Sequence, residues 1–139
     1  MAVARTELQV TWDTGNNSYS LVTATWAQTS DAMTMTATGF AATIHLKADQ
    51  TVGTPASGDY VDFFAQLTGG DPDGAGADEY DTDGHDIFLC RIDVNVDDPG
   101  LKSVNFPVAC ESFKIRALGT GFTSTDAVSV SGTLTVLTA

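Results

Sequence analysis

Alternation of apolar and polar residues with a period of two runs through most of this chain, and it constrains the fold more than any other feature. Near the N-terminus, Leu8, Val10 and Trp12 alternate with polar neighbours. The same period returns at 42–48, 60–67, 88–96, 113–117 and 128–136. Successive side chains of a β-strand point to opposite faces, so this period gives each segment one apolar row that can face a core.

Turn-forming residues separate the alternating segments, and shorter strands are expected at 19–26, 33–36 and 104–108. Pro107 indicates an edge strand or a bulge, and Gly132 indicates a bulge or a close approach of two backbones. The chain has 20 Thr, 15 Asp and only 3 Glu, a balance that favours pleated strands and turns over helices. We predict an all-β fold, a jelly-roll-like two-sheet β-sandwich with eight or nine antiparallel strands, ahead of an immunoglobulin-like sandwich.

The chain of 139 residues is expected to be a single domain, 1–139. The last expected strand reaches almost to the C-terminus, so that end is expected to be paired in a sheet. Residues 1–6 are not part of an expected strand and could form an N-terminal arm. No signal peptide and no apolar run of about 20 residues is visible. Cys90 and Cys110 lie in or beside apolar strand segments, so we expect free thiols in preference to a disulfide.

The formal net charge is −12, with only six Lys and Arg. Binding to a phosphate backbone or an anionic membrane needs clustered cations. The sequence has no such cluster. We therefore expect neither nucleic acid nor a membrane as a direct partner.

The segment 71–86 holds seven carboxylates and three glycines, with no Lys or Arg. Such a loop repels itself unless water or a cation occupies it. It could be a solvated acidic loop, or it could bind calcium, which takes carboxylate and carbonyl oxygens on a flexible backbone. The EF-hand spacing is absent. If a cation binds, the two Asp-x-Asp-Gly units supply the expected ligands, Asp71, Asp73, Asp81 and Asp83.

Other candidate sites have simpler interpretations. His45 lies on the polar face of a strand and His85 lies in the acidic segment, and we expect neither to bind a metal. Cys90 could pair with His85, but a thiol on an apolar strand face is normally inert. No catalytic motif is present, so we expect no enzyme and no small-molecule substrate. Tyr60 and Phe64 share a polar strand face, which indicates cover by a loop or by another chain. We favour a protein interface there over a platform on which sugars stack.

The middle half of the chain resembles small structural proteins of tailed bacteriophages. The similar residues are Lys-Ala-Asp, G-T-P-A-S-G-D before an aromatic strand, G-D-P-D-G, D-E-Y-D-T and G-H. They lie at 47–49, 53–59, 70–74, 78–82 and 84–85.

This resemblance implies a non-enzymatic virion protein, most plausibly a capsid decoration or cement protein. Its expected partners are the major capsid protein and copies of itself, with a homotrimer suited to three-fold positions. It implies assembly into the virion after synthesis in the host bacterial cytoplasm. The alternatives are a tail or baseplate component and, from a different class, a calcium-dependent carbohydrate-binding module.

Overall fold

The structure, a computed structural model, describes every residue except 1, 69, 77–78 and 82–85. The described residues form ten strands and no helix. The strands are β1 (Ala4–Gln9), β2 (Tyr19–Leu21), β3 (Ala27–Thr29), β4 (Met33–Thr34), β5 (Gly39–Val52), β6 (Tyr60–Thr68), β7 (Ile87–Asp93), β8 (Gly100–Phe106), β9 (Ser112–Thr120) and β10 (Ala127–Thr138). The prediction of an all-β fold is confirmed. The described part of the chain has no helix long and apolar enough to cross a membrane.

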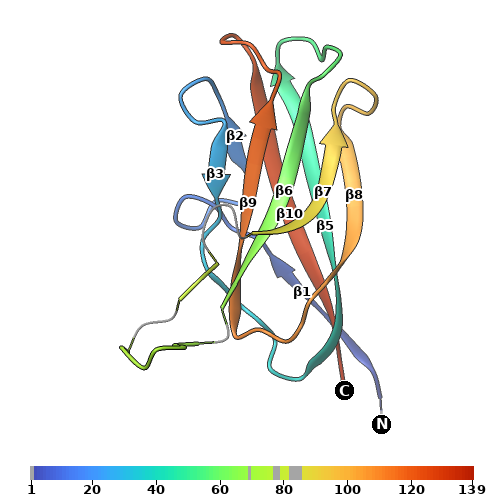
Figure 1. The fold of residues 1–139 in the computed structure, drawn as a ribbon. Helices are drawn as coiled ribbons and strands as arrows, with labels where there is room; N and C mark the ends of the chain where they lie inside the picture. The colour runs from blue at the N-terminus through green and yellow to red at the C-terminus, as the bar shows by residue number, and fades with distance from the viewer. Residues whose placement is uncertain (1, 69, 77–78, 82–85) are drawn as a thin grey trace.

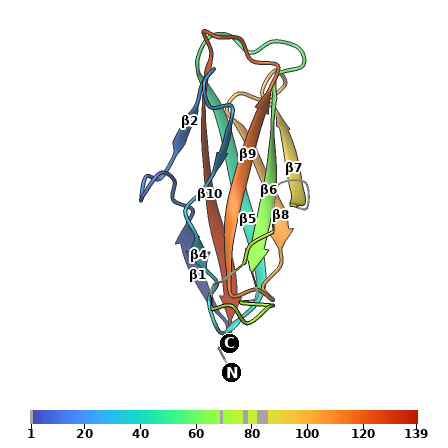
Figure 2. The same cartoon turned by 60° about the vertical axis from the view of Figure 1, so that its left-hand side comes forward.

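The strands form two antiparallel sheets that pack face to face (Figures 1 and 2). The first sheet has the order β1-β10-β5-β8, with β2 also paired to β10. The second sheet has the order β3-β9-β6-β7, with β4 also paired to β9. β1 and β2 can be counted as one interrupted strand, and so can β3 and β4, which leaves eight strands. Numbered anew along the chain, these eight strands have the order 1-8-3-6 in the first sheet and 2-7-4-5 in the second. This is the strand order of a jelly roll, as predicted.

Two expectations about the N-terminal half are wrong. The segment 19–26 is not one strand, because the Thr25 amide donates to the Val22 carbonyl at 2.7 Å and turns the chain from β2 in the first sheet to β3 in the second. Nor do residues 4–6 form a free arm, because they pair with 136–138 of β10. Interrupted edge strands of two and three residues explain the count of ten strands in place of eight or nine.

The core lies between the sheets and is built from the apolar rows that the alternation predicted. Trp12, Phe63 and Phe113 are its largest fully buried side chains. Strand β10 is a central strand of the first sheet, since it pairs with β1 and β2 on one side and with β5 on the other. The register is regular at Gly132, where a Cβ atom would lie 3.0 Å from Leu46. Gly132 is therefore a point of close approach and does not mark a bulge.

The edges of the sandwich are short or incompletely paired. Strand β8 ends at Phe106, one residue before the proline that we expected within it, and it forms one edge of the first sheet. Strand β7 forms an edge of the second sheet. The two edges meet along one side of the molecule, joined by the turn 94–99 (Figure 1).

Candidate functional site

The acidic segment brings three carboxylates together at the end of the sandwich that also holds the chain termini (Figure 1). Carboxylate oxygens of Asp71, Asp73 and Glu79 lie within 4.8 Å of one another. The Glu79 amide donates to the Gly70 carbonyl at 3.0 Å, which closes the loop and places Glu79 beside the two aspartates. The sequence prediction missed Glu79, because this backbone contact follows no ligand-spacing pattern.

The remaining predicted calcium ligands behave differently. Asp81 is held at the end of β6, where its amide donates to the Leu67 carbonyl at 3.1 Å. It lines the same hollow of about 410 Å³ as Asp71 and Glu79, but it is not part of the carboxylate cluster. Asp83 and His85 lie outside the described residues.

Backbone amides already occupy part of the carboxylate cluster. The amides of Gly76 and Ala75 donate to Asp71, and the Gly76 hydrogen bond is the main cause that lowers the pKa of Asp71 below its usual range. Calcium takes about six to eight oxygen ligands. The three carboxylates could supply at most six oxygens, so a cation here would also need water or carbonyl ligands.

Tyr80 and Asp86 of the acidic segment contact the outer face of the second sheet. The Tyr80 hydroxyl lies 2.7 Å from the Ser112 hydroxyl, and the Lys114 ammonium lies 4.3 Å from the centre of the Tyr80 ring. Asp86 accepts hydrogen bonds from Gln66 at 3.1 Å and from Arg116 at 3.1 Å. The Asp86 side chain is only 2% exposed, so these contacts form a buried attachment between the segment and the sheet.

A row of cations and aromatic rings continues along this face. Arg91 donates two hydrogen bonds to Asp62, at 2.8 and 2.9 Å, and its guanidinium lies 3.7 Å from the centre of the Tyr60 ring. The hydrogen bonds to Asp62 raise the pKa of Arg91 above its ordinary value. Phe64 packs edge to face against Phe88, with ring centres 5.7 Å apart. Tyr60 and Phe64 are therefore contacted by Arg91 and Phe88, side chains of the neighbouring strand β7. Cover of these two rings by a loop or by another chain stays a prediction.

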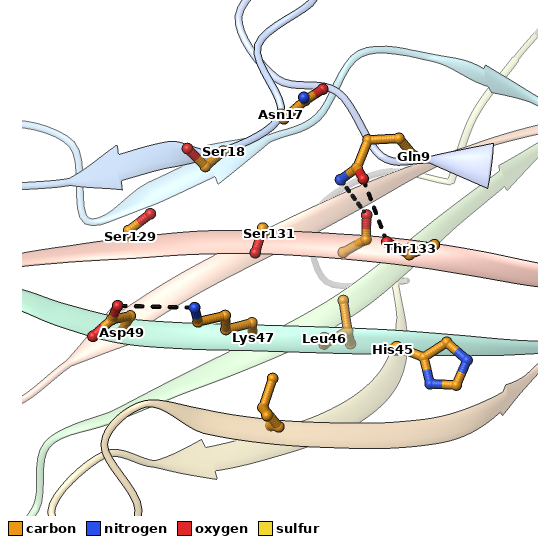
Figure 3. Close-up of a pocket in the computed structure, with 12 residues that line it drawn as sticks. Gln9, Asn17, Ser18, His45, Leu46, Lys47, Asp49, Ser129, Ser131 and Thr133 are labelled. Carbon is orange, nitrogen blue, oxygen red and sulfur yellow. Dashed lines mark hydrogen bonds and ion pairs between the residues drawn. The ribbon is translucent and has the colours of Figure 1, made fainter. Parts of the chain in front are cut away.

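A second concave feature lies on the outer face of the first sheet (Figure 3). We call it the polar trough; it is open to solvent and has a volume of about 500 Å³. Its lining residues come from β1, the segment before β2, β5, β8 and β10. They are Gln9, Asn17, Ser18, His45, Leu46, Lys47, Asp49, Leu101, Ser129, Ser131, Gly132 and Thr133. Sequence reasoning did not find the trough, because it forms from strands far apart in the chain.

Both cysteines are at least partly buried, and His45 contacts two hydroxyl groups. Both cysteines are free, as expected. Desolvation by burial raises the pKa of Cys90 to about 11, and burial also raises the pKa of Cys110. A thiol with a raised pKa is a poor nucleophile at neutral pH, because little thiolate is present. His45 lies between Ser103 and Thr135, with its ring nitrogens 2.7 and 3.3 Å from their hydroxyls.

No protein-family model matches this chain, and no curated protein matches it.

Proposed function

We propose that this chain is a non-enzymatic structural protein of a bacteriophage virion. Its role would be that of a capsid decoration or cement protein that binds between major capsid subunits and stabilises the head. The jelly-roll strand order supports the proposal by analogy, because this architecture recurs in viral capsid proteins. A fold alone does not define a function, so the argument depends on the surface.

One side of the sandwich combines unpaired strand edges with exposed apolar side chains. Nine large apolar residues are exposed in the described part of the chain, and four of them lie on β7, on β8 or in the turn between them. We call this side the β7–β8 margin: Ile87, Phe88, Val96 and Leu101. Phe88 is 56% and Val96 80% exposed. An exposed apolar edge strand favours association with another chain, and this observation carries the proposal.

The charge of the chain indicates what this margin would contact. At −12, isolated copies repel one another, which opposes uncontrolled assembly through the margin. A larger shell with a less acidic surface would be the favoured partner. Contacts with two capsid subunits would stabilise the assembled state by mass action, since the protein binds the shell and not the separated subunits. Copies arranged as a homotrimer at three-fold positions are part of the proposal.

Rebinding to stripped phage particles tests the proposal. Wild-type protein should rebind in a fixed, icosahedrally related copy number, and decorated particles should retain their genome to a higher temperature than stripped ones. The double variant Phe88→Asp/Val96→Asp should fail to rebind. Val3→Asp changes an exposed apolar residue beside β1, at the opposite edge of the first sheet from β8, and it should rebind normally.

Three results would contradict a decoration role. Equal genome retention in stripped and decorated particles would remove the stabilising function. A copy number of a few per particle would assign the chain to the tail or baseplate. Absence from particles, together with sugar binding that a chelator abolishes, would favour the calcium-dependent carbohydrate-binding module.

A further inference from the structure

We propose that the polar trough binds a neutral oligosaccharide. The proposal is independent of the capsid role, because the trough lies on the outer face of the first sheet (Figure 3). Of the margin residues, only Leu101 also lines it. It is also separate from the acidic segment, which contributes no lining residue, and it needs no calcium.

The shape of the trough follows from side-chain size. The outward side chains of the central strand β10 are short here: Ser129, Ser131 and Thr133. Longer side chains border them, with Gln9 on one flank and Lys47 on the other. Neighbouring strands lie about 4.8 Å apart, so the space above β10 between its two neighbours is roughly 10 Å across. Its volume of about 500 Å³ is within the range of pockets that hold small ligands, about 300–1,000 Å³.

The lining has hydrogen-bonding groups that the fold does not use. Within the described chain, the hydroxyls of Ser18, Ser129 and Ser131 make no hydrogen bond. The Gln9 amide, in contrast, is fixed: its nitrogen donates to the Gly132 carbonyl at 2.9 Å, and its oxygen accepts from Thr133 at 3.4 Å. Free hydroxyls beside an oriented amide can exchange hydrogen bonds with a ligand that is itself rich in hydroxyls.

The charge of the trough favours a neutral ligand. Lys47 and Asp49 are its only lysine, arginine or carboxylate side chains; their charged atoms lie 4.0 Å apart and their charges cancel. A chain of net charge −12 therefore presents a locally balanced surface here. An anionic or a cationic polymer would find no uncompensated partner in the trough.

Leu101 completes the match to a sugar. It is 68% exposed at the border of the trough, where it offers an apolar surface to the C–H face of a pyranose ring. A protein surface docked on the trough would bury the free serine hydroxyls, and each would need a new partner to offset its desolvation. An oligosaccharide supplies such partners along its whole length.

Saturation-transfer NMR followed by titration calorimetry tests this inference. The probes are maltotriose, cellotriose, mannotriose and chitotriose, with a heparin disaccharide as the anionic comparison. At least one neutral trisaccharide should bind at or below about 10 mM, the weak range expected of an open site. Binding should persist in EDTA. Ser129→Ala/Ser131→Ala should weaken it about tenfold, as expected for the loss of two hydrogen bonds.

A blocking variant and a matched control separate the trough from the rest of the surface. Ser131→Tyr should abolish binding, because the ring would fill the space above β10. Thr43→Tyr changes a half-buried residue on the same sheet that does not line the trough, and it should leave binding unchanged. Three results would overturn the inference: no neutral trisaccharide binds, Ser131→Tyr binds as well as wild type, or EDTA abolishes binding.

Discussion

Removal of the Asp86 carboxylate should destabilise the protein strongly, although Asp86 lies in a highly acidic segment where the loss of one negative charge relieves repulsion. The side chain is 2% exposed and bonds both Gln66 and Arg116, whose side chain is 18% exposed. Asp86→Ala would remove the acceptor of these two hydrogen bonds. Hydrogen bonds to charged groups contribute about 1.5–3 kcal/mol each, so the loss of both costs about 3 kcal/mol or more. For a domain of this size, 3 kcal/mol corresponds to a fall of roughly 10 °C in Tm.

Urea unfolding followed by tryptophan fluorescence measures this loss. Asp97→Ala is the control, because Asp97 is exposed and forms no side-chain hydrogen bond or ion pair among the described residues. It should change the free energy of unfolding by less than about 0.5 kcal/mol. If Asp86→Ala were as stable as Asp97→Ala, the attachment would contribute nothing and the reasoning would fail.

Three further predictions follow from the backbone, the thiols and one capped turn. Gly121→Ala should lower the free energy of unfolding by clearly more than Gly58→Ala, for which about 1–2 kcal/mol is expected. Both glycines have φ +92°, but of the two only Gly121 would bring a Cβ atom against a backbone oxygen, at 2.4 Å. Equal denaturation midpoints for the two variants would be inconsistent with this contact. Timed alkylation at pH 8 with peptide mapping should modify half-buried Cys110 before Cys90, whose pKa is about 11, and equal rates would argue against the burial of Cys90. Hydrogen bonds from Thr14, Thr11 and Gly15 lower the pKa of Asp31 below 3.8, so the stability that Asp31 contributes is present above that pH and is lost as the pH falls through the lowered pKa. In urea unfolding, Asp31→Asn should therefore reduce stability at neutral pH and weaken the fall of stability below about pH 4. An unchanged dependence of stability on pH would contradict this role of Asp31.

The period-two pattern predicted the sandwich well because it reports burial directly. Trp12 and Phe63 were expected in the core and are fully buried. The pattern failed at 19–26, where the chain keeps its strand-like composition while it crosses from one sheet to the other. Such a crossing depends on a local turn, at Val22 and Thr25, whose residues have no strong turn preference.

The site features were harder to predict because they depend on contacts between distant residues. Asp71 and Asp73 were expected together and are together, but Glu79 joins them through a backbone contact that no motif encodes. The Asp86–Arg116 pair joins residues 30 positions apart. The polar trough likewise depends on strand order, which alternation does not specify.

The copy number of this chain in purified phage particles tests the central claim most directly. Quantitative mass spectrometry should give a ratio of this chain to the major capsid protein that icosahedral symmetry fixes, with many copies of the chain in each particle. A ratio of only a few copies per particle, or none, would contradict a role in decorating the head.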